Sequence, residues 1–200
     1  MSEWLDESFI GQAFIGETVT VATNSRFTDC KFIGAKFESA KMTSCHFENC
    51  DFTRASFADA TLKGCVFAQA DFTDAGFFAA RLLGARMIAC QFQGSDLRSI
   101  QQEACDWSFC QLRLQDLRVL DLTSLKLIET DLYGANLSQS ILKKADLSRA
   151  ILAHAKLDGA DLRDAILDGV DLTQTSVVKA KFDVSVAIRF AQSHGAIVEG

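Results

Sequence analysis

The feature that most constrains this chain is an apolar residue at every fifth position. From Phe27 to Phe182, 32 positions lie five residues apart, and 31 of them hold Phe, Leu, Met, Trp or Val, with Gln102 as the exception. Two residues before each of these, 28 of the 32 positions hold a small side chain. No insertion interrupts the count, so one unit repeats along most of the chain. The exceptions at the small position cluster near the middle: Ile100, Gln115, Leu120 and Leu125.

A period of five excludes the two simple regular structures. In an α-helix, five steps of about 100° turn the apolar residue by about 140° per repeat, so the repeats wind around the helix instead of forming one face. In a β-strand, successive apolar residues point to opposite sides, because five is odd. The pattern fits a chain that turns a corner in every repeat, with the apolar and small residues directed at a common axis. The period alone leaves open whether three or four corners close one coil.

The repeats resemble those of the pentapeptide-repeat family, whose motif is Ala, then Asp or Asn, then Leu, then two variable residues. The resemblance implies an all-β fold, a right-handed quadrilateral β-helix in which four repeats close a coil of about 20 residues. The 32 repeats then make about eight regular coils from residue 25, a rod of roughly 40 Å at the usual strand spacing of about 4.8 Å. Four segments match the motif directly: Ala70–Phe72, Ala135–Leu137, Ala145–Leu147 and Ala160–Leu162.

We expect one β-helix domain over residues 1–182 and a capping helix with a dimerisation tail over residues 183–200. The count slips by three residues between Val19 and Phe27, which predicts a bulge or short loop near residues 20–26. Bulky residues at the small position predict widened or kinked coils over residues 100–125. Nearby outward positions are also apolar, and we expect some of them to turn inward; the alternative is an exposed belt for a partner. These positions are Phe78, Leu83, Ile88, Phe109, Leu114 and Val119.

The unusual composition follows from the same repeat. Proline is absent, as expected where nearly every repeat donates a backbone N–H to a neighbouring coil. All seven cysteines occupy the small inward position, where we expect free thiols that pack as small apolar groups. The cysteines are Cys30, Cys45, Cys50, Cys65, Cys90, Cys105 and Cys110.

The sequence contains no recognisable catalytic or metal-binding motif. His46, His154 and His194 lie far apart in the repeat count, so we expect no zinc site. The chain has no glycine-rich phosphate loop and no G-x-S-x-G motif. Its paired carboxylates, such as Asp71 with Asp74, are expected to be solvated and therefore unsuited to general acid catalysis. We expect no enzyme, no cofactor and no metal.

The five-residue count stops after Phe182, and Asp183 there predicts the N-cap of a helix that ends at Gly195. Such a helix would shield the last coil from solvent. Its expected face comprises Val184, Ala187, Ile188 and Ala191, and further apolar residues beyond it predict a symmetric homodimer through this end. The candidate interface comprises Val184, Ala187, Ile188, Phe190, Ala191, Ile197 and Val198.

The charge distribution limits the partners. A net charge of −6 disfavours direct binding of nucleic acid, which depends on clustered Lys and Arg. When the outward positions are assigned to four faces, two adjacent faces carry −2 each, and the others 0 and +2. A solubilising coat would explain this asymmetry equally well. Candidate partner-facing acids near the dimer end are Asp131, Asp146, Asp168 and Asp171.

No apolar run approaches the roughly 18 residues of a membrane span, and the first residues are acidic where a secretory signal would be basic. We therefore expect a cytoplasmic protein without a membrane partner.

Within the family, the chain is most similar to the branch that protects type II topoisomerases from poisons, and above all to albicidin-resistance proteins. The resemblance implies a homodimer that mimics DNA, binds DNA gyrase and confers antibiotic resistance or self-immunity, with albicidin the favoured drug. Unlike plasmid quinolone-resistance proteins, this chain has no looped insertion between repeats. The alternative is a non-catalytic scaffolding rod. The sequence leaves open the drug, the gyrase subunit contacted, and whether the role is self-immunity or regulation.

Overall fold

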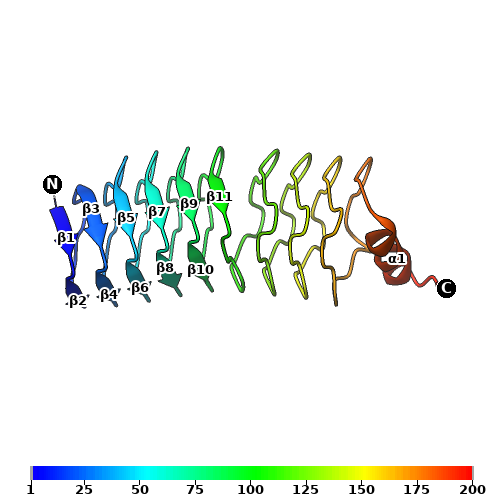
Figure 1. Ribbon diagram of the computed structural model, residues 1–200, viewed down its shortest axis with the longest axis horizontal. Coiled ribbons are helices and arrows are strands. Elements are labelled where there is room, and N and C mark those ends of the chain that lie inside the picture. Colours follow the sequence, from blue (N-terminus) through cyan, green and yellow to red (C-terminus); the bar gives the residue numbers. More distant parts are fainter. Residues whose placement is uncertain (1, 200) are drawn as a thin grey trace.

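The computed structural model describes residues 2–199 as a rod in which the chain winds coil after coil from the N-terminus to a helix at the opposite end (Figure 1). Named strands occupy the first half, up to residue 103, and the helix follows the last coil. The elements are β1 (Ser2–Leu5), β2 (Ser8–Ile10), β3 (Val19–Thr23), β4 (Arg26–Thr28), β5 (Lys41–Thr43), β6 (His46–Glu48), β7 (Thr61–Lys63), β8 (Val66–Ala68), β9 (Arg81–Leu83), β10 (Arg86–Ile88), β11 (Gln101–Glu103) and α1 (Val184–Ser193).

Each repeat makes one corner of a coil. In the repeat around Leu147, the carbonyl of Leu147 accepts a hydrogen bond of 2.9 Å from the N–H of Ala150, and Arg149 takes a φ of 57°. This is the arrangement of a type II turn, whose third residue needs a positive φ. Leu147 and Ala145 are both fully buried. The predicted inward placement of the apolar and small residues is therefore confirmed.

Successive coils pair in parallel with a register of 20 residues. Asp51 pairs with Lys31 before it and Asp71 after it, and in the strands Phe27 of β4 lies opposite Phe47 of β6. One side carries a six-stranded sheet in the order β1-β3-β5-β7-β9-β11, and another carries a five-stranded sheet in the order β10-β8-β6-β4-β2. A register of 20 with a repeat of five gives four sides per coil. The predicted right-handed quadrilateral β-helix is confirmed.

The first coil is shorter than the others. Phe9 of β2 lies opposite Phe27 of β4, and Trp4 of β1 lies opposite Ala22 of β3, an offset of 18 residues in both cases. The register shifts beside Val19, and both Val19 and Ala22 are fully buried. Strand β3 thus absorbs the three-residue slip of the sequence by directing two core residues inward from one continuous strand.

Stacked aromatic rings fill the N-terminal half of the core, and leucines fill the C-terminal half. The rings of Phe27 and Phe47 are 4.7 Å apart, and those of Phe47 and Phe67 are 4.8 Å apart, with interplanar angles of 5° for both pairs. Such offset stacking contributes beyond the burial of apolar area. Farther along the same column, at the register of 20, Leu127 and Leu147 are buried. The identity of the repeated apolar residue therefore determines the kind of core.

The coil ladder is interrupted near residue 100. Gln91 still pairs with Gln111, but among the described residues no bridge joins Asp96 to Asp116 or Gln101 to Asp121. The ladder resumes one coil later, where Asp116 pairs with Asn136. We call this interruption, between residues 94–104 and 113–123, the ladder break. It coincides with the bulky residues that the sequence places at the small inward position.

The C-terminal helix α1 covers the last coil. Asp183 accepts a hydrogen bond of 3.0 Å from the N–H of Val186, so the predicted N-cap is confirmed. The predicted packing face is wrong: Val186 is buried, and the ring of Phe190 lies 5.6 Å from that of Phe182, whereas Val184 is 77% exposed. Val186 and Phe190 therefore form the face of the helix that meets the core. Within residues 2–199, none of the helical structure combines the length and apolarity that a bilayer crossing requires.

Candidate functional site

The candidate partner-facing acids have local partners. The carboxylate of Asp131 accepts a 3.0 Å bond from the N–H of Tyr133, and those of Asp146 and Asp171 accept bonds of 3.0 and 2.8 Å from Ser148 and Thr173. A carboxylate just before the apolar residue thus bonds the backbone two residues on and stabilises the turn. For Asp171, these bonds hold the carboxyl pKa below its ordinary value, so the group stays ionised. Part of the acidic signal in the sequence is therefore structural.

Two of these acids also form ion pairs. Asp131 lies 2.9 Å from Nη1 of Arg113, and Asp168 lies 2.6 Å from Nη2 of Arg189 on α1. The Asp131 side chain is only 15% exposed, while that of Asp168 is 61% exposed. The pair at Asp168 ties α1 to the last coils. Of the two paired acids, Asp168 presents much more of its side chain to a partner.

The coil register separates the acids instead of joining them. Asp146 stands in a column between Lys126 and Ile166. Asp131 stands between Gln111 and Ile151, so neither has an acidic neighbour in its own column. This end of the rod therefore carries dispersed negative charge, unlike the regular rows of phosphates on duplex DNA.

The C-terminal end exposes apolar side chains. Val184 is 77% exposed, Ile197 89%, Val198 41% and Val178 64%. Ala187 is also exposed, while Ile188, Phe190 and Ala191 are half-buried. The candidate dimer residues thus divide into a set that packs against the last coil and a set that remains accessible.

Some of the six apolar outward positions near the middle of the rod were expected to turn inward. Leu83 and Ile88 are half-buried, but for the other four the expectation is wrong. Phe109 is 47% exposed, Leu114 75%, Val119 68% and Phe78 53%. The inward slots of this region are already filled by bulky side chains such as Ile100 and Leu120, which are buried. No room remains for a second apolar residue, so these side chains form part of the surface.

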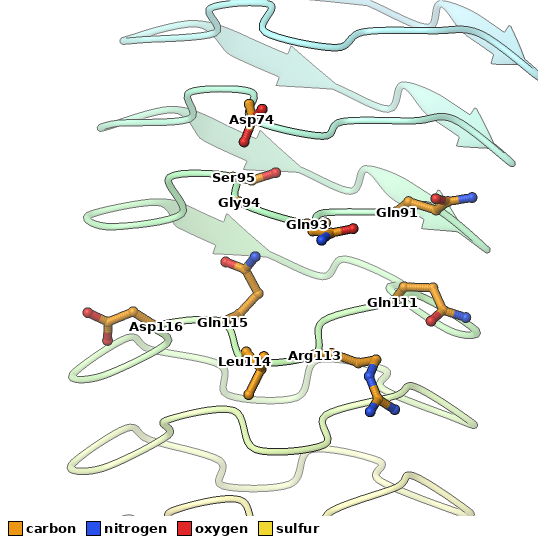
Figure 2. A pocket seen from close by; sticks show the side chains of 10 residues that line it. All are labelled: Asp74, Gln91, Gln93, Gly94, Ser95, Gln111, Arg113, Leu114, Gln115 and Asp116. Atoms are coloured by element: carbon orange, nitrogen blue, oxygen red, sulfur yellow. The ribbon is translucent and has the colours of Figure 1, made fainter.

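The ladder break opens onto a groove of about 910 Å³, shown in Figure 2. Gln91 and Gln93 lie along the coil above the gap, Gln111 and Arg113 lie along the coil below it, and Gln115 reaches across. We call it the amide groove. Its lining comprises Asp74, Gln91, Gln93, Gly94, Ser95, Gln111, Arg113, Leu114, Gln115 and Asp116. A second, smaller groove of about 390 Å³ continues around the corner, beside Arg98 and Val119.

The sequence reasoning did not identify the amide groove, although two signals point to it. Gln91 and Gln111 are 20 residues apart and therefore share a column, and Gln115 occupies a slot that is otherwise small. Recognising the groove required knowing that the bulky inward residues hold two coils apart.

The seven cysteines are free and buried, as predicted. Burial raises the pKa of Cys50 to about 12 and also raises that of Cys105. Thiols of this kind are poor nucleophiles at neutral pH. Among residues 2–199, no three His, Cys, Asp or Glu side chains gather into a group that could hold a metal ion. These cysteines pack as small core residues.

Comparisons with known proteins agree with this geometry. The family model "Pentapeptide repeats" matches residues 116–153, 130–169 and 145–183, and the model "SV2A/B/C luminal domain" matches residues 17–92. No curated protein matches the chain. Among solved structures, trypsin-treated QnrB1, a plasmid-mediated fluoroquinolone resistance protein, aligns with a TM-score of 0.82 at 23% identity, covering 98% of this chain and 99% of QnrB1. Full-length QnrB1 aligns with a TM-score of 0.70 at 20% identity, covering 94% and 100%.

The coil geometry defines the fold as a four-sided β-helix, and the pentapeptide-repeat model matches residues 116–183 of it. The fold is that of QnrB1 along almost its whole length.

Proposed function

We propose that this protein is a non-catalytic antibiotic-resistance or self-immunity factor that binds DNA gyrase in the cytoplasm and protects it from a topoisomerase poison, with albicidin as the favoured drug. The observation that carries the proposal is the agreement of its fold, over 98% of the chain, with a protein of fluoroquinolone resistance. The rod also carries a net charge of −6. Negative charge steers an elongated protein toward the basic surfaces with which enzymes hold DNA.

We further propose that the active form is a homodimer joined through the C-terminal ends. The support is the cluster of accessible apolar side chains there, which includes Val184, Ile197 and Val198. An apolar end beside a rigid rod is buried most simply by a symmetric contact with a second copy. The dimer would present one continuous rod of doubled length. Asp168 lies near that junction, and its side chain is more exposed than that of Asp131, the other ion-paired candidate acid.

A scaffolding role is the second candidate, and one observation favours it. Asp131, Asp146 and Asp171 bond the backbone of their own turns, so the acidic residues have a reason to be present in any rod of this fold. A scaffolding protein would bind no topoisomerase.

The test is a supercoiling assay with purified gyrase, with albicidin or a fluoroquinolone present or absent, over a series of protein concentrations. We expect the protein to restore supercoiling in the presence of at least one poison. A direct binding measurement by biolayer interferometry accompanies it, at several salt concentrations, because electrostatic steering weakens with salt. Absence of both binding and rescue would reject gyrase as the partner and favour the scaffolding role.

A further inference from the structure

A regular repeat of this β-helix donates three hydrogen bonds between coils. Around Leu132, for example, the N–H of Asp131 bonds to Cys110, that of Leu132 to Ile151, and that of Gly134 to Ala153, with distances of 2.9 Å for all three. At the ladder break, seven N–H groups in the equivalent positions have no acceptor among the described residues. They belong to Gly94, Leu97, Ser99, Gln102, Ala104, Asp116 and Asp121.

Two glutamine side chains occupy the gap. The Nε2 of Gln102 donates at 3.1 Å to the carbonyl of Asp121, which the ladder leaves free, and the Nε2 of Gln115 donates to the carbonyl of Phe92 from a position that holds a small residue in regular coils. Ile100 and Leu120 fill the inward slots beside them and are buried. Closing the coils would require these side chains to leave the core. The unpaired backbone groups are therefore a fixed feature of the folded protein.

Exposed apolar side chains border this gap in an unfavourable backbone conformation. Leu114 lines the amide groove and Val119 lines the smaller groove, with φ values of 59° and 56°. A left-handed conformation costs a residue with a β-carbon roughly 1–2 kcal/mol, and glycine, which takes this conformation without that cost, occupies the equivalent turn position in Gly134 and Gly159. Leu114 and Val119 are 75% and 68% exposed, so burial in the free protein compensates little of this cost.

We propose that the ladder break is a docking site for an extended backbone segment of the partner protein. An extended chain presents N–H and C=O groups at the spacing of a β-ladder, and a row of unpaired edge groups binds such a chain by strand addition. The amides of Gln91, Gln93 and Gln111 supply both donors and acceptors to its peptide groups.

The chemistry of the rim defines the segment further. The arginines beside the gap are all paired: Arg98 with Asp96 at 2.8 Å, Arg113 with Asp131 at 2.9 Å and Arg118 with Asp116 at 2.7 Å, so they leave no free positive charge for an acidic segment. The segment therefore carries no acidic side chains, and its apolar side chains contact Leu114 and Val119. This inference rests on the proposed function in taking gyrase as the partner.

Hydrogen exchange of the backbone, measured by NMR or mass spectrometry with and without the complete gyrase heterotetramer, tests the proposal. We expect exchange at the seven unpaired amides to slow at least tenfold in the complex. Binding of gyrase with protection confined to other coils would overturn the docking site and leave the proposed function intact. If gyrase does not bind at all, the proposed function fails and this inference falls with it.

Variants separate docking from folding. The double variant Leu114→Gly/Val119→Gly removes both apolar side chains and relieves two left-handed residues, so its melting temperature should be equal to or above that of the parent. We expect its gyrase affinity to fall at least tenfold. The matched control is Phe109→Gly, which removes an exposed apolar residue with a φ of 65° from the same coil, on a side where the ladder is intact. Unchanged affinity in the double variant, or an equal loss in the control, would refute the docking site.

Discussion

Replacing one stacked ring measures how much the aromatic columns contribute to stability. Phe57 is fully buried, and its ring lies 4.6 Å from that of Phe37 and 4.8 Å from that of Phe77, with interplanar angles of 1° and 6°. Phe57→Leu retains an apolar side chain but a smaller one, so it loses transfer free energy and leaves a small cavity. It also removes two stacked pairs, each worth about 0.5–1.5 kcal/mol. We therefore expect a further loss of about 1–3 kcal/mol from stacking.

The assay is urea unfolding followed by circular dichroism, with Met42→Leu as the control. Met42 is fully buried in a column whose next members are Leu62 and Leu82, and the variant exchanges one flexible apolar side chain for another. The double variant Phe37→Leu/Phe57→Leu completes a mutant cycle, in which we expect a coupling of about 0.5–1.5 kcal/mol. Equal losses for Phe57→Leu and Met42→Leu, or additivity of the two phenylalanine changes within about 0.3 kcal/mol, would refute stacking as a separate contribution.

Three other outcomes are expected. Val184→Lys should convert the dimer to a monomer in analytical ultracentrifugation. The control Ile141→Lys changes a side chain that is 37% exposed on the side of the rod, and it should leave the mass unchanged. A dimer in both variants would exclude the C-terminal interface. Bonds from the backbone N–H groups of Asp164 and Val186 lower the pKa of Asp183 from 3.8 to about 2. The folded state therefore binds its proton less readily than the unfolded chain, so this stabilisation is complete above about pH 4 and is lost as the pH falls toward 2. As the pH falls over that range, the Tm of Asp183→Asn should decrease less than the Tm of the parent protein. An equal decrease in both proteins would contradict a stabilising role of the ionised Asp183 carboxylate. The buried thiols, including Cys50, should resist a thiol reagent in the native state, and all seven should react in denaturant; rapid native labelling would contradict their burial.

Much of the fold could be predicted because the repeat is local and exact. Each apolar residue such as Leu147 and each small residue such as Ala145 points inward wherever the count of five holds. The N-cap at Asp183 was also predictable, because capping depends on residues adjacent in sequence. The orientation of the following helix was not: Val186 and Phe190 pack inward in place of Val184. The position of the last coil selects which of two apolar faces is covered.

The sequence by itself determined the β-helix, the inward cysteines and the change from a ring core to a leucine core, since each follows from which residue occupies a fixed position in the repeat. Only the tertiary structure decided whether Leu114 and Val119 are exposed or buried, and whether the amide groove forms. Whether an outward residue is covered, and whether two coils close, depends on the volume available inside the coil. That volume depends on several side chains together, such as Ile100, Gln115 and Leu120. The repeat pattern describes each position separately and therefore does not predict it.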